Sequence, residues 1–344
     1  MSNFFNSAVL VKQKKPLKFF KVLMPQPKEG QVLVRIIYSG FCSSQFGEIE
    51  GVKGKDNYLP HFLGHEACGI VEKCGEKVSK VKKNDLAILH WMKAKGLECE
   101  KIEYLSSDGV KINSGKVTTF STYTLVSENR LTKIKKNLFP LKYLPLMGCS
   151  IPVAISTLEK ILKIRKKKNI LILGSGAIGI PMIHYCKYKN LNNIDVLDSN
   201  LISINKAKSF GASNTFKNLN NEHLVKKLQS NFYDYIVDTT GSSKLITQVL
   251  SYPITCKFSF LGVPNHKEKI QFNSLKINYG LQLLGSYGGN FNPDRDIKKY
   301  LNFLKKNKFN YKSYIHKIYP FKEINNLIKD YKNKKIIGKA IIKF

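Results

Sequence analysis

The sequence predicts an α/β protein of two domains, and three observations support this fold class. The chain has 344 residues, which is more than one ordinary hydrophobic core accommodates. Residues 1–90 contain short β-branched and aliphatic segments separated by turns that are rich in proline and glycine. From about residue 150, buried strands alternate with helical segments, a pattern typical of a doubly wound parallel sheet with right-handed crossovers.

The first part of the chain is predicted to form a β-rich module. Residues 92–120 are polar and irregular, and Cys42 lies just past the end of a strand. The β-branched segments and the turns before them place strands at 8–11, 31–37, 69–71, 86–89 and 122–126.

The second part is predicted to form the parallel sheet. Aliphatic runs place its strands at 169–173, 194–198, 235–238, 258–262 and 281–285. Helices are expected after Gly179, near 201–210 and near 243–250. Beyond this sheet, the pattern predicts helices over about 293–306 and 321–332 and a final strand from Ile336 to Ile342.

A glycine motif lies where the first strand of the second part meets its helix. Gly174 permits a tight turn, Gly176 permits close approach of a pyrophosphate, and Gly179 permits close packing of helix and strand. Asp198 ends the next strand, where it can accept hydrogen bonds from ribose hydroxyls and repel a 2′-phosphate. No Arg follows it, so the motif predicts NAD rather than NADP.

A second group of residues has the chemistry of a zinc site. His65 and Glu66 lie side by side in a glycine-containing stretch, and Cys42 and Cys149 can add thiolates from elsewhere in the chain. Two Cys and one His are ligands that zinc prefers, and three protein ligands leave a fourth position open for catalysis.

The composition describes a globular chain with an unusual charge. The hydrophobic content is 43% and the net charge is +33, yet only four of the 57 basic residues are Arg. Because nucleic-acid sites favour Arg forks and the Lys residues are spread over the whole chain, specific nucleic-acid binding is not expected. The charge is expected to attract anionic substrates.

The cysteine usage and the hydropathy favour the cytoplasm. None of the seven cysteines forms a Cys-x-x-Cys pair, and no apolar run approaches the roughly 20 residues that span a bilayer. The N-terminal residues lack the basic and apolar regions of a signal peptide. Cys68, Cys74, Cys186 and Cys256 are interpreted as packing thiols, and His61, His223, His266 and His316 as ordinary surface or loop residues.

Taken together, the two motifs and their spacing resemble the zinc-dependent alcohol dehydrogenases of the medium-chain dehydrogenase/reductase superfamily. The likeness covers nearly the whole chain and includes Gly148-Cys149, Asp238-Thr239-Thr240-Gly241 and the ending Gly338-Lys339-Ala340. It implies a GroES-like β domain over 1–149 and 286–344, with an inserted Rossmann NAD-binding domain over 150–285. It also implies a homodimer or homotetramer.

The resemblance assigns roles to individual residues. Ser44 would relay the alcohol proton, Glu66 would enter the coordination sphere during ligand exchange, and His90 and Trp91 would line the substrate pocket. The implied zinc ligands are Cys42, His65 and Cys149 with Glu66 in reserve, and the implied cofactor contacts are Gly174, Gly176, Ala177, Ile178, Gly179, Asp198 and Thr240.

Four departures from the family pattern bear on mechanism. The lobe 92–116 holds Cys99 alone, so one catalytic zinc and no structural zinc is expected. Gln45 replaces the acid that orients the histidine ligand, so His65 is expected to use another partner. Gly47 replaces a relay histidine, and Val153 replaces a cofactor-contacting threonine.

These observations lead to an NAD-linked, zinc-dependent alcohol dehydrogenase that interconverts an alcohol with an aldehyde or ketone. The alternatives are a polyol or sugar-derivative dehydrogenase of the same superfamily, whose substrate could be phosphorylated or nucleotide-linked, and a nucleic-acid-binding protein. Cys149 favours the alcohol dehydrogenase, because polyol relatives commonly replace that thiolate.

Overall fold

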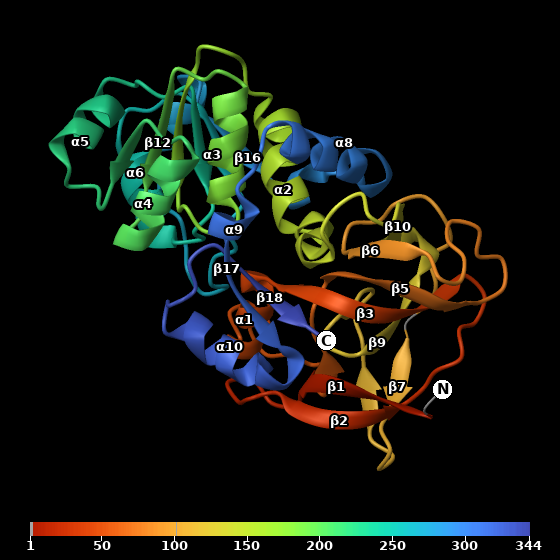
Figure 1. Cartoon of the computed structure of the whole chain (residues 1–344). Coiled ribbons are helices and arrows are strands. Elements are labelled where there is room, and N and C mark those ends of the chain that lie inside the picture. Colours follow the sequence, from red (N-terminus) through yellow and green to blue (C-terminus); the bar gives the residue numbers. More distant parts are fainter. Residues whose placement is uncertain (1–2, 101) are drawn as a thin grey trace. The chain divides into compact units, whose positions relative to one another are not determined.

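The computed structural model describes residues 3–100 and 102–344, and the chain divides into two compact units (Figure 1). The first unit contains the chain up to Ser150 with Asn292–Phe303 and Ile315–Phe344, and the second contains Ile151–Phe291 and Leu304–Tyr314. The predicted division assigned all of 286–344 to the first domain. Residues 286–291 and 304–314 belong to the second unit instead. In the second of these segments the Phe309 ring packs on His184 and Phe210 at centroid distances of 5.0 and 5.3 Å.

The first unit contains two sheets. One has the strand order β2-β1-β4-β8-β7, and the other has the order β10-β6-β5-β3-β18-β17, with β9 also pairing with β3. Val32, Val34 and Ile36 alternate along β3 and are buried together in one aliphatic cluster of the larger sheet. The strands are β1 Phe4–Leu10, β2 Lys18–Leu23, β3 Gln31–Phe41, β4 His61–Phe62, β5 Glu66–Cys74, β6 Leu86–His90, β7 Glu103–Leu105, β8 Lys111–Asn113, β9 Tyr123–Ser127, β10 Leu131–Ile134, β17 Ile315–Pro320 and β18 Lys339–Lys343.

Short helices join these strands. Helix α1 (Ser43–Glu50) starts directly after Cys42 and ends at Gly51, whose φ of 72° suits glycine. The sequence patterns did not predict α1. The other helical segments of this unit are the 3₁₀ helices Glu128–Arg130, Leu141–Gly148 and Phe321–Glu323, most of α8 (Pro293–Lys306), and α10 (Ile324–Lys332).

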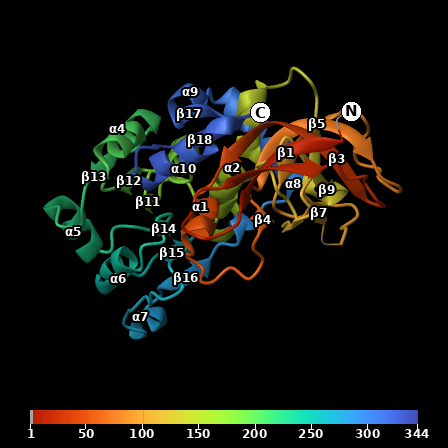
Figure 2. The same cartoon turned by 90° about the horizontal axis from the view of Figure 1, so that it is seen from below.

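The second unit is built on a parallel six-stranded sheet, as predicted. Its order is β13-β12-β11-β14-β15-β16, all pairs are parallel, and Figure 2 shows strands β12 to β16 side by side in this order. Chain order reverses between β11 and β14, which makes their carboxyl ends the switch point where ligands bind in such sheets. The strands are β11 Asn169–Leu173, β12 Asn193–Leu197, β13 Asn214–Phe216, β14 Tyr235–Asp238, β15 Lys257–Phe260 and β16 Gln282–Gly285.

Helices cover both faces of this sheet. Leu171 and Leu173 of β11 share a buried cluster with residues of α5 and α6, whereas Ile172 points to the opposite face, near Gly179 of α3. The helices are α2 Ser150–Ser156, continued by a π-helical turn Thr157–Leu162, α3 Gly179–Tyr188, α4 Leu201–Phe210, α5 Glu222–Gln229, α6 Ser243–Ser251, α7 Leu275–Asn278, the 3₁₀ turn Gly288–Asn290 and α9 Tyr311–Tyr314.

The main differences from the predicted elements are short strands and helices. The stretch 92–120 contains β7 and β8, and the sequence patterns also missed strands β2, β4, β10, β13 and β17 and helices α1, α2, α5, α7 and α9. Among the described residues, no single helix is long and apolar enough to cross a membrane. The bent pair Leu141–Gly148 and Ser150–Leu162 meets that test only when its two helices are counted together.

Candidate metal and dinucleotide sites

Strand register in the larger sheet gathers the predicted metal ligands. β3 and β5 are antiparallel and pair Ser39 with Ala67, so Cys42, just after β3, comes close to His65, just before β5. β6 pairs with β5 through His90 and Glu66, and the 3₁₀ turn that ends at Gly148 packs on the same strands. Cys149 follows that turn and completes the group.

The three side chains form one compact donor set. The ligand atoms of Cys42, His65 and Cys149 all lie within 4.8 Å of one another. Nε2 of His65 is buried and has no hydrogen-bond partner among the described residues. An unpaired buried nitrogen beside two sulfur atoms is the donor set that zinc satisfies, so the residues present fit the ion.

The electrostatic environment of the donor set favours the thiolate form of Cys42. A hydrogen bond from Cys149 holds the pKa of Cys42 well below its usual value, although burial opposes this shift. The same contact, together with burial, raises the pKa of Cys149. Burial alone would lower the pKa of His65, but the close approach and the charge of Cys42 raise it. Because thiolates are the metal-binding form of cysteine, Cys42 is prepared for coordination.

Gln45 is the partner of His65, which corrects the expectation that another group takes this place. Its side-chain amide lies 2.5 Å from Nδ1 of His65, one turn into α1 from Cys42. Metal binding through Nε2 leaves the proton on Nδ1, and the Gln45 carboxamide can then accept it through Oε1 by turning over. A neutral amide therefore orients the ring in place of a carboxylate.

Glu66 lies beside this group rather than within it. Its Oε1 forms an ion pair with the ammonium of Lys339, both side chains are fully or almost fully buried, and Oε2 has no partner among the described residues. Burial raises the pKa of Glu66, and the charge of Lys339 opposes the shift. A Cβ at Gly40 would lie 2.6 Å from the carboxyl carbon of Glu66 and 2.7 Å from its Oε1, so glycine there makes room for the carboxylate. The sequence patterns gave Lys339 no role, because its partner lies 273 positions away.

The two residues that were predicted to line the substrate pocket, Trp91 and His90, lie in different environments. The Trp91 ring lies edge-on to His65, with ring centroids 6.4 Å apart, so the structure brings it beside the metal ligands. His90 is fully buried, and its ring nitrogens bond the Met92 carbonyl and the Thr132 hydroxyl at 2.8 and 3.1 Å. Burial lowers the pKa of His90 to about 4. His90 thus has no surface to offer a substrate, and the expectation that it lines a pocket is corrected.

The glycine motif forms a tight loop at the switch point of the parallel sheet. Gly174 has a φ of 93°, and a Cβ there would lie 2.6 Å from the Thr239 hydroxyl. A Cβ at Gly179 would lie 2.1 Å from the Gly174 carbonyl oxygen, whereas the space beside Gly176 is open. The loop leads into the N-terminus of α3, and helix N-termini are sites where phosphate groups bind. Ala177 and Ile178 are half-buried in this loop.

Asp198 lies against the same loop. Its carboxylate accepts hydrogen bonds from the Ser175 amide at 2.8 Å and the Ser175 hydroxyl at 2.9 Å, and from the Asn200 amide at 2.9 Å. Thr240 is exposed after β14, and its hydroxyl donates to buried Asp238. The structure therefore brings together the glycine loop, Asp198 and the Thr239-Thr240 loop at one edge of the sheet.

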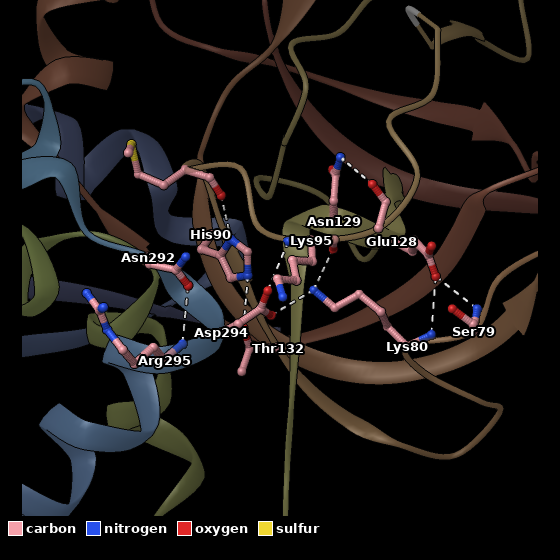
Figure 3. A network of polar contacts seen from close by, with 12 residues as sticks. Ser79, Lys80, His90, Lys95, Glu128, Asn129, Thr132, Asn292, Asp294 and Arg295 are labelled. Carbon is pink, nitrogen blue, oxygen red and sulfur yellow. Dashed lines mark hydrogen bonds and ion pairs between the residues drawn. The ribbon is translucent and has the colours of Figure 1, made fainter.

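The lobe 92–116 is held by acidic side chains. Arg130 donates to both oxygens of Glu98 at 2.9 and 3.1 Å and also to the Trp91 carbonyl. Glu128 accepts the backbone amides of Leu97, Ser79 and Lys80 at 2.9–3.2 Å. In Figure 3, the Lys80 side chain and the backbone of Lys95 point to Asp294 at the start of α8, at 2.8 and 2.9 Å. Within residues 3–100 and 102–344, no second group of three candidate metal ligands was found.

Comparisons with known proteins agree with this fold. The model of the alcohol dehydrogenase GroES-like domain matches residues 28–136. An alcohol dehydrogenase zinc-binding domain protein from Burkholderia ambifaria is similar at 20% identity, with 99% of each chain covered and a TM-score of 0.88. Benzyl alcohol dehydrogenase from Acinetobacter calcoaceticus is similar at 22% identity, with 100% of each chain covered and a TM-score of 0.87.

A third similar structure contains a cofactor. Acetophenone reductase from Geotrichum candidum, solved with NAD, shares 18% identity, with 100% of this chain and 98% of that chain covered and a TM-score of 0.82. At these sequence identities, the three similar structures show that the fold is shared.

Proposed function

We propose that this chain, which carries the GroES-like domain of alcohol dehydrogenases and has the fold of their zinc-dependent medium-chain members, is an oxidoreductase that transfers hydride between NAD(H) and an alcohol, aldehyde or ketone. The observation that carries the proposal is the buried donor set of Cys42, His65 and Cys149. The glycine loop with Asp198 supports the nicotinamide cofactor.

The donor set fits one zinc ion. Cys42 supplies the thiolate with the lowered pKa, and Cys149 and His65 complete three ligands. When bound, zinc would supply a Lewis acid for the substrate oxygen, and NAD would supply the acceptor for hydride. Gln45 holds the His65 ring, and Lys339 holds the Glu66 carboxylate close to the ligands.

Ser44 is the residue that we assign to proton transfer. It follows Cys42 by two positions, and its hydroxyl is buried with no hydrogen-bond partner among the described residues. A hydroxyl in that position can pass the alcohol proton onward. Gly47 offers no imidazole to continue the path, so the proton would leave through ribose hydroxyls and water.

The charge of Asp198 favours NAD over NADP as the cofactor. The Asp198 carboxylate would accept hydrogen bonds from the adenosine ribose and would repel the 2′-phosphate of NADP. NAD is therefore the proposed cofactor, with a small alcohol or carbonyl compound as substrate.

The first prediction is the metal content. The purified protein should bind one zinc per chain and produce NADH from an alcohol. Cys42→Ser and His65→Ala should lose both zinc and activity, because each removes one of three ligands. Cys99→Ser, a control in the lobe 92–116, should keep both.

Elemental analysis and NADH absorbance provide the measurements. A fully active protein without zinc would contradict the proposal. Two tightly held zinc ions per chain would contradict the single-site assignment.

A further inference from the structure

The first turn of α3 lacks one of its hydrogen-bond donors. In an α-helix each carbonyl accepts the amide of the residue four positions further along the chain. The carbonyls of Gly176 and Ile178 do so, at 3.2 and 3.3 Å. The carbonyl between them belongs to Ala177, and the residue four positions on is Pro181, which has no N–H to donate. The glycine loop therefore contains a carbonyl that needs a donor from elsewhere.

Tyr314 supplies that donor. Its hydroxyl donates to the Ala177 carbonyl at 2.5 Å, although the two residues are 137 positions apart in the chain. The Tyr314 side chain is fully buried, and both residues belong to the second unit. Among the described residues, Tyr314 is the only donor to this carbonyl. The hydroxyl thus takes the place of the amide that Pro181 cannot provide.

Aromatic packing fixes the position of Tyr314. Its ring lies edge-on to the Phe309 ring, with centroids 5.4 Å apart. Phe309 in turn packs on His184 of α3 and Phe210 of α4. Because the ring is held between buried neighbours, its hydroxyl can hold the glycine loop in one position.

A fixed carbonyl at Ala177 also fixes the next amide. The peptide bond between Ala177 and Ile178 is trans, since the described cis bond is Leu59-Pro60. In a trans peptide group the C=O and the N–H point in opposite directions, so the Ile178 N–H points away from Tyr314. No described residue accepts this N–H. It is one of the free amides at the start of α3, where helix N-termini bind phosphate.

We propose that Tyr314 is a positioning residue for the cofactor, which holds the peptide group between Ala177 and Ile178 so that its N–H can donate to the pyrophosphate. This inference rests on the proposed function, because it concerns the NAD(H) site of that function. Since Tyr314 is fully buried, it acts through the loop and not by contact with the cofactor.

The variant Tyr314→Phe keeps the ring and removes the hydroxyl. It should raise the dissociation constant of NADH by about 3- to 10-fold, which corresponds to the net contribution of one hydrogen bond. Fluorescence titration measures this constant, and competition with NADH gives the constants of two smaller probes. ADP carries the pyrophosphate and should lose affinity by the same factor, whereas adenosine has no phosphate and should stay within about twofold.

A second substitution tests the mechanism directly. Pro181→Ala restores an N–H four positions after Ala177, so the loop no longer depends on the hydroxyl. The double variant Tyr314→Phe/Pro181→Ala should therefore bind NADH more tightly than Tyr314→Phe alone. Pro181→Ala should improve binding more in the Tyr314→Phe background than in the wild type, because the two donors serve one carbonyl.

Tyr233→Phe is the matched control. Tyr233 is also a buried tyrosine of the second unit, but its hydroxyl donates to Asp195 at 2.8 Å and does not contact the glycine loop. Its removal should lower Tm while the dissociation constant of NADH stays within about twofold. Tm, measured in all variants, therefore separates a loss of stability from a loss of positioning.

Three results would overturn the role of Tyr314. They are unchanged NADH affinity in Tyr314→Phe, equal losses for ADP and adenosine, and no recovery in the double variant. A wild type that binds NADH but oxidises no alcohol would contradict the proposed reaction, while the variant series would still decide the role of Tyr314. A wild type that binds neither NADH nor ADP would overturn both.

Discussion

At the scale of single residues, the charge of Asp198 is predicted to decide the cofactor. Asp198→Asn keeps an oxygen acceptor for the Ser175 amide, so the loop should survive, but it removes the charge that repels a 2′-phosphate. The ratio of the NADP and NAD dissociation constants should fall by roughly tenfold, equivalent to about 1.4 kcal/mol.

Fluorescence titration with NADH and NADPH measures both constants. Glu222→Gln removes the same charge from an exposed position in the second unit and should leave the ratio unchanged. Tighter binding of NADPH than NADH by the wild type would show the cofactor assignment to be wrong.

The three residues of the donor set could be predicted from the sequence, but the residues that hold the site in place could not. Cys42, His65 and Cys149 could be named because they lie in motifs that resemble those of the zinc-dependent alcohol dehydrogenases, whereas residue type alone does not separate them from the other cysteines and histidines. The roles of Gln45 and Lys339 could not be read in this way. Gln45 has no special chemistry until α1 turns it toward His65, and Lys339 meets Glu66 only through the pairing of β18 with β3. The buried state of His90 likewise depends on the β10 residue Thr132.

At the scale of elements, the strand and helix pattern predicted the parallel sheet well and the β-rich unit less well. Strands such as β11 are continuous aliphatic runs, because helices cover both faces. β2 is largely exposed, and β7 and β8 have three residues each, so neither period nor composition identifies them. Helix α1 contains two Ser and one Gly and has only two fully buried residues, so it lacks an apolar stripe.

The lobe 92–116 depends on the ion pair of Glu98 with Arg130. Burial opposes ionisation, but the hydrogen bonds and charge of Arg130 lower the pKa of Glu98 to about 2. A carboxyl whose pKa is depressed by folding stabilises the protein above its unfolded pKa of about 4.3, and this stabilisation is lost as the pH falls through the folded value. The pair should therefore hold the lobe at neutral pH and weaken in acid.

The variant Glu98→Gln tests whether the ion pair with Arg130 stabilises the lobe 92–116. At pH 7 it should lower Tm by roughly 2–4 °C, the shift expected for about 1 kcal/mol in a domain of this size. The difference from the wild type should shrink as the pH falls below about 4.3, because protonation removes the same charge. Calorimetry over a pH series provides the measurement, and Glu76→Gln, at an exposed position of the first unit, is the control. A Tm difference that is absent at pH 7, or constant down to pH 3, would contradict the role of Glu98.

At the scale of the whole molecule, the charge of +33 is spread over lysines rather than concentrated in an arginine site. Three of the four arginines are already paired: Arg35 with Glu72, Arg130 with Glu98, and Arg295 with Asp296. An arginine held by a carboxylate is less available to form a fork to a phosphate or a base. The charge should therefore produce diffuse attraction to anions without a specific nucleic-acid site.

The dependence of binding on salt concentration distinguishes diffuse attraction to anions from a specific nucleic-acid site. A diffuse lysine surface binds DNA by releasing counterions, so its affinity falls steeply between about 50 and 200 mM salt. NADH should also be attracted by the charge, but contacts of the glycine loop and Asp198 should keep it bound. We predict that anisotropy of a labelled DNA duplex loses its binding signal by about 0.2 M NaCl, while NADH titrations in the same buffers lose much less affinity. A DNA dissociation constant that stays near or below about 1 μM at 0.2 M NaCl, tighter than typical non-specific binding, would favour a nucleic-acid function.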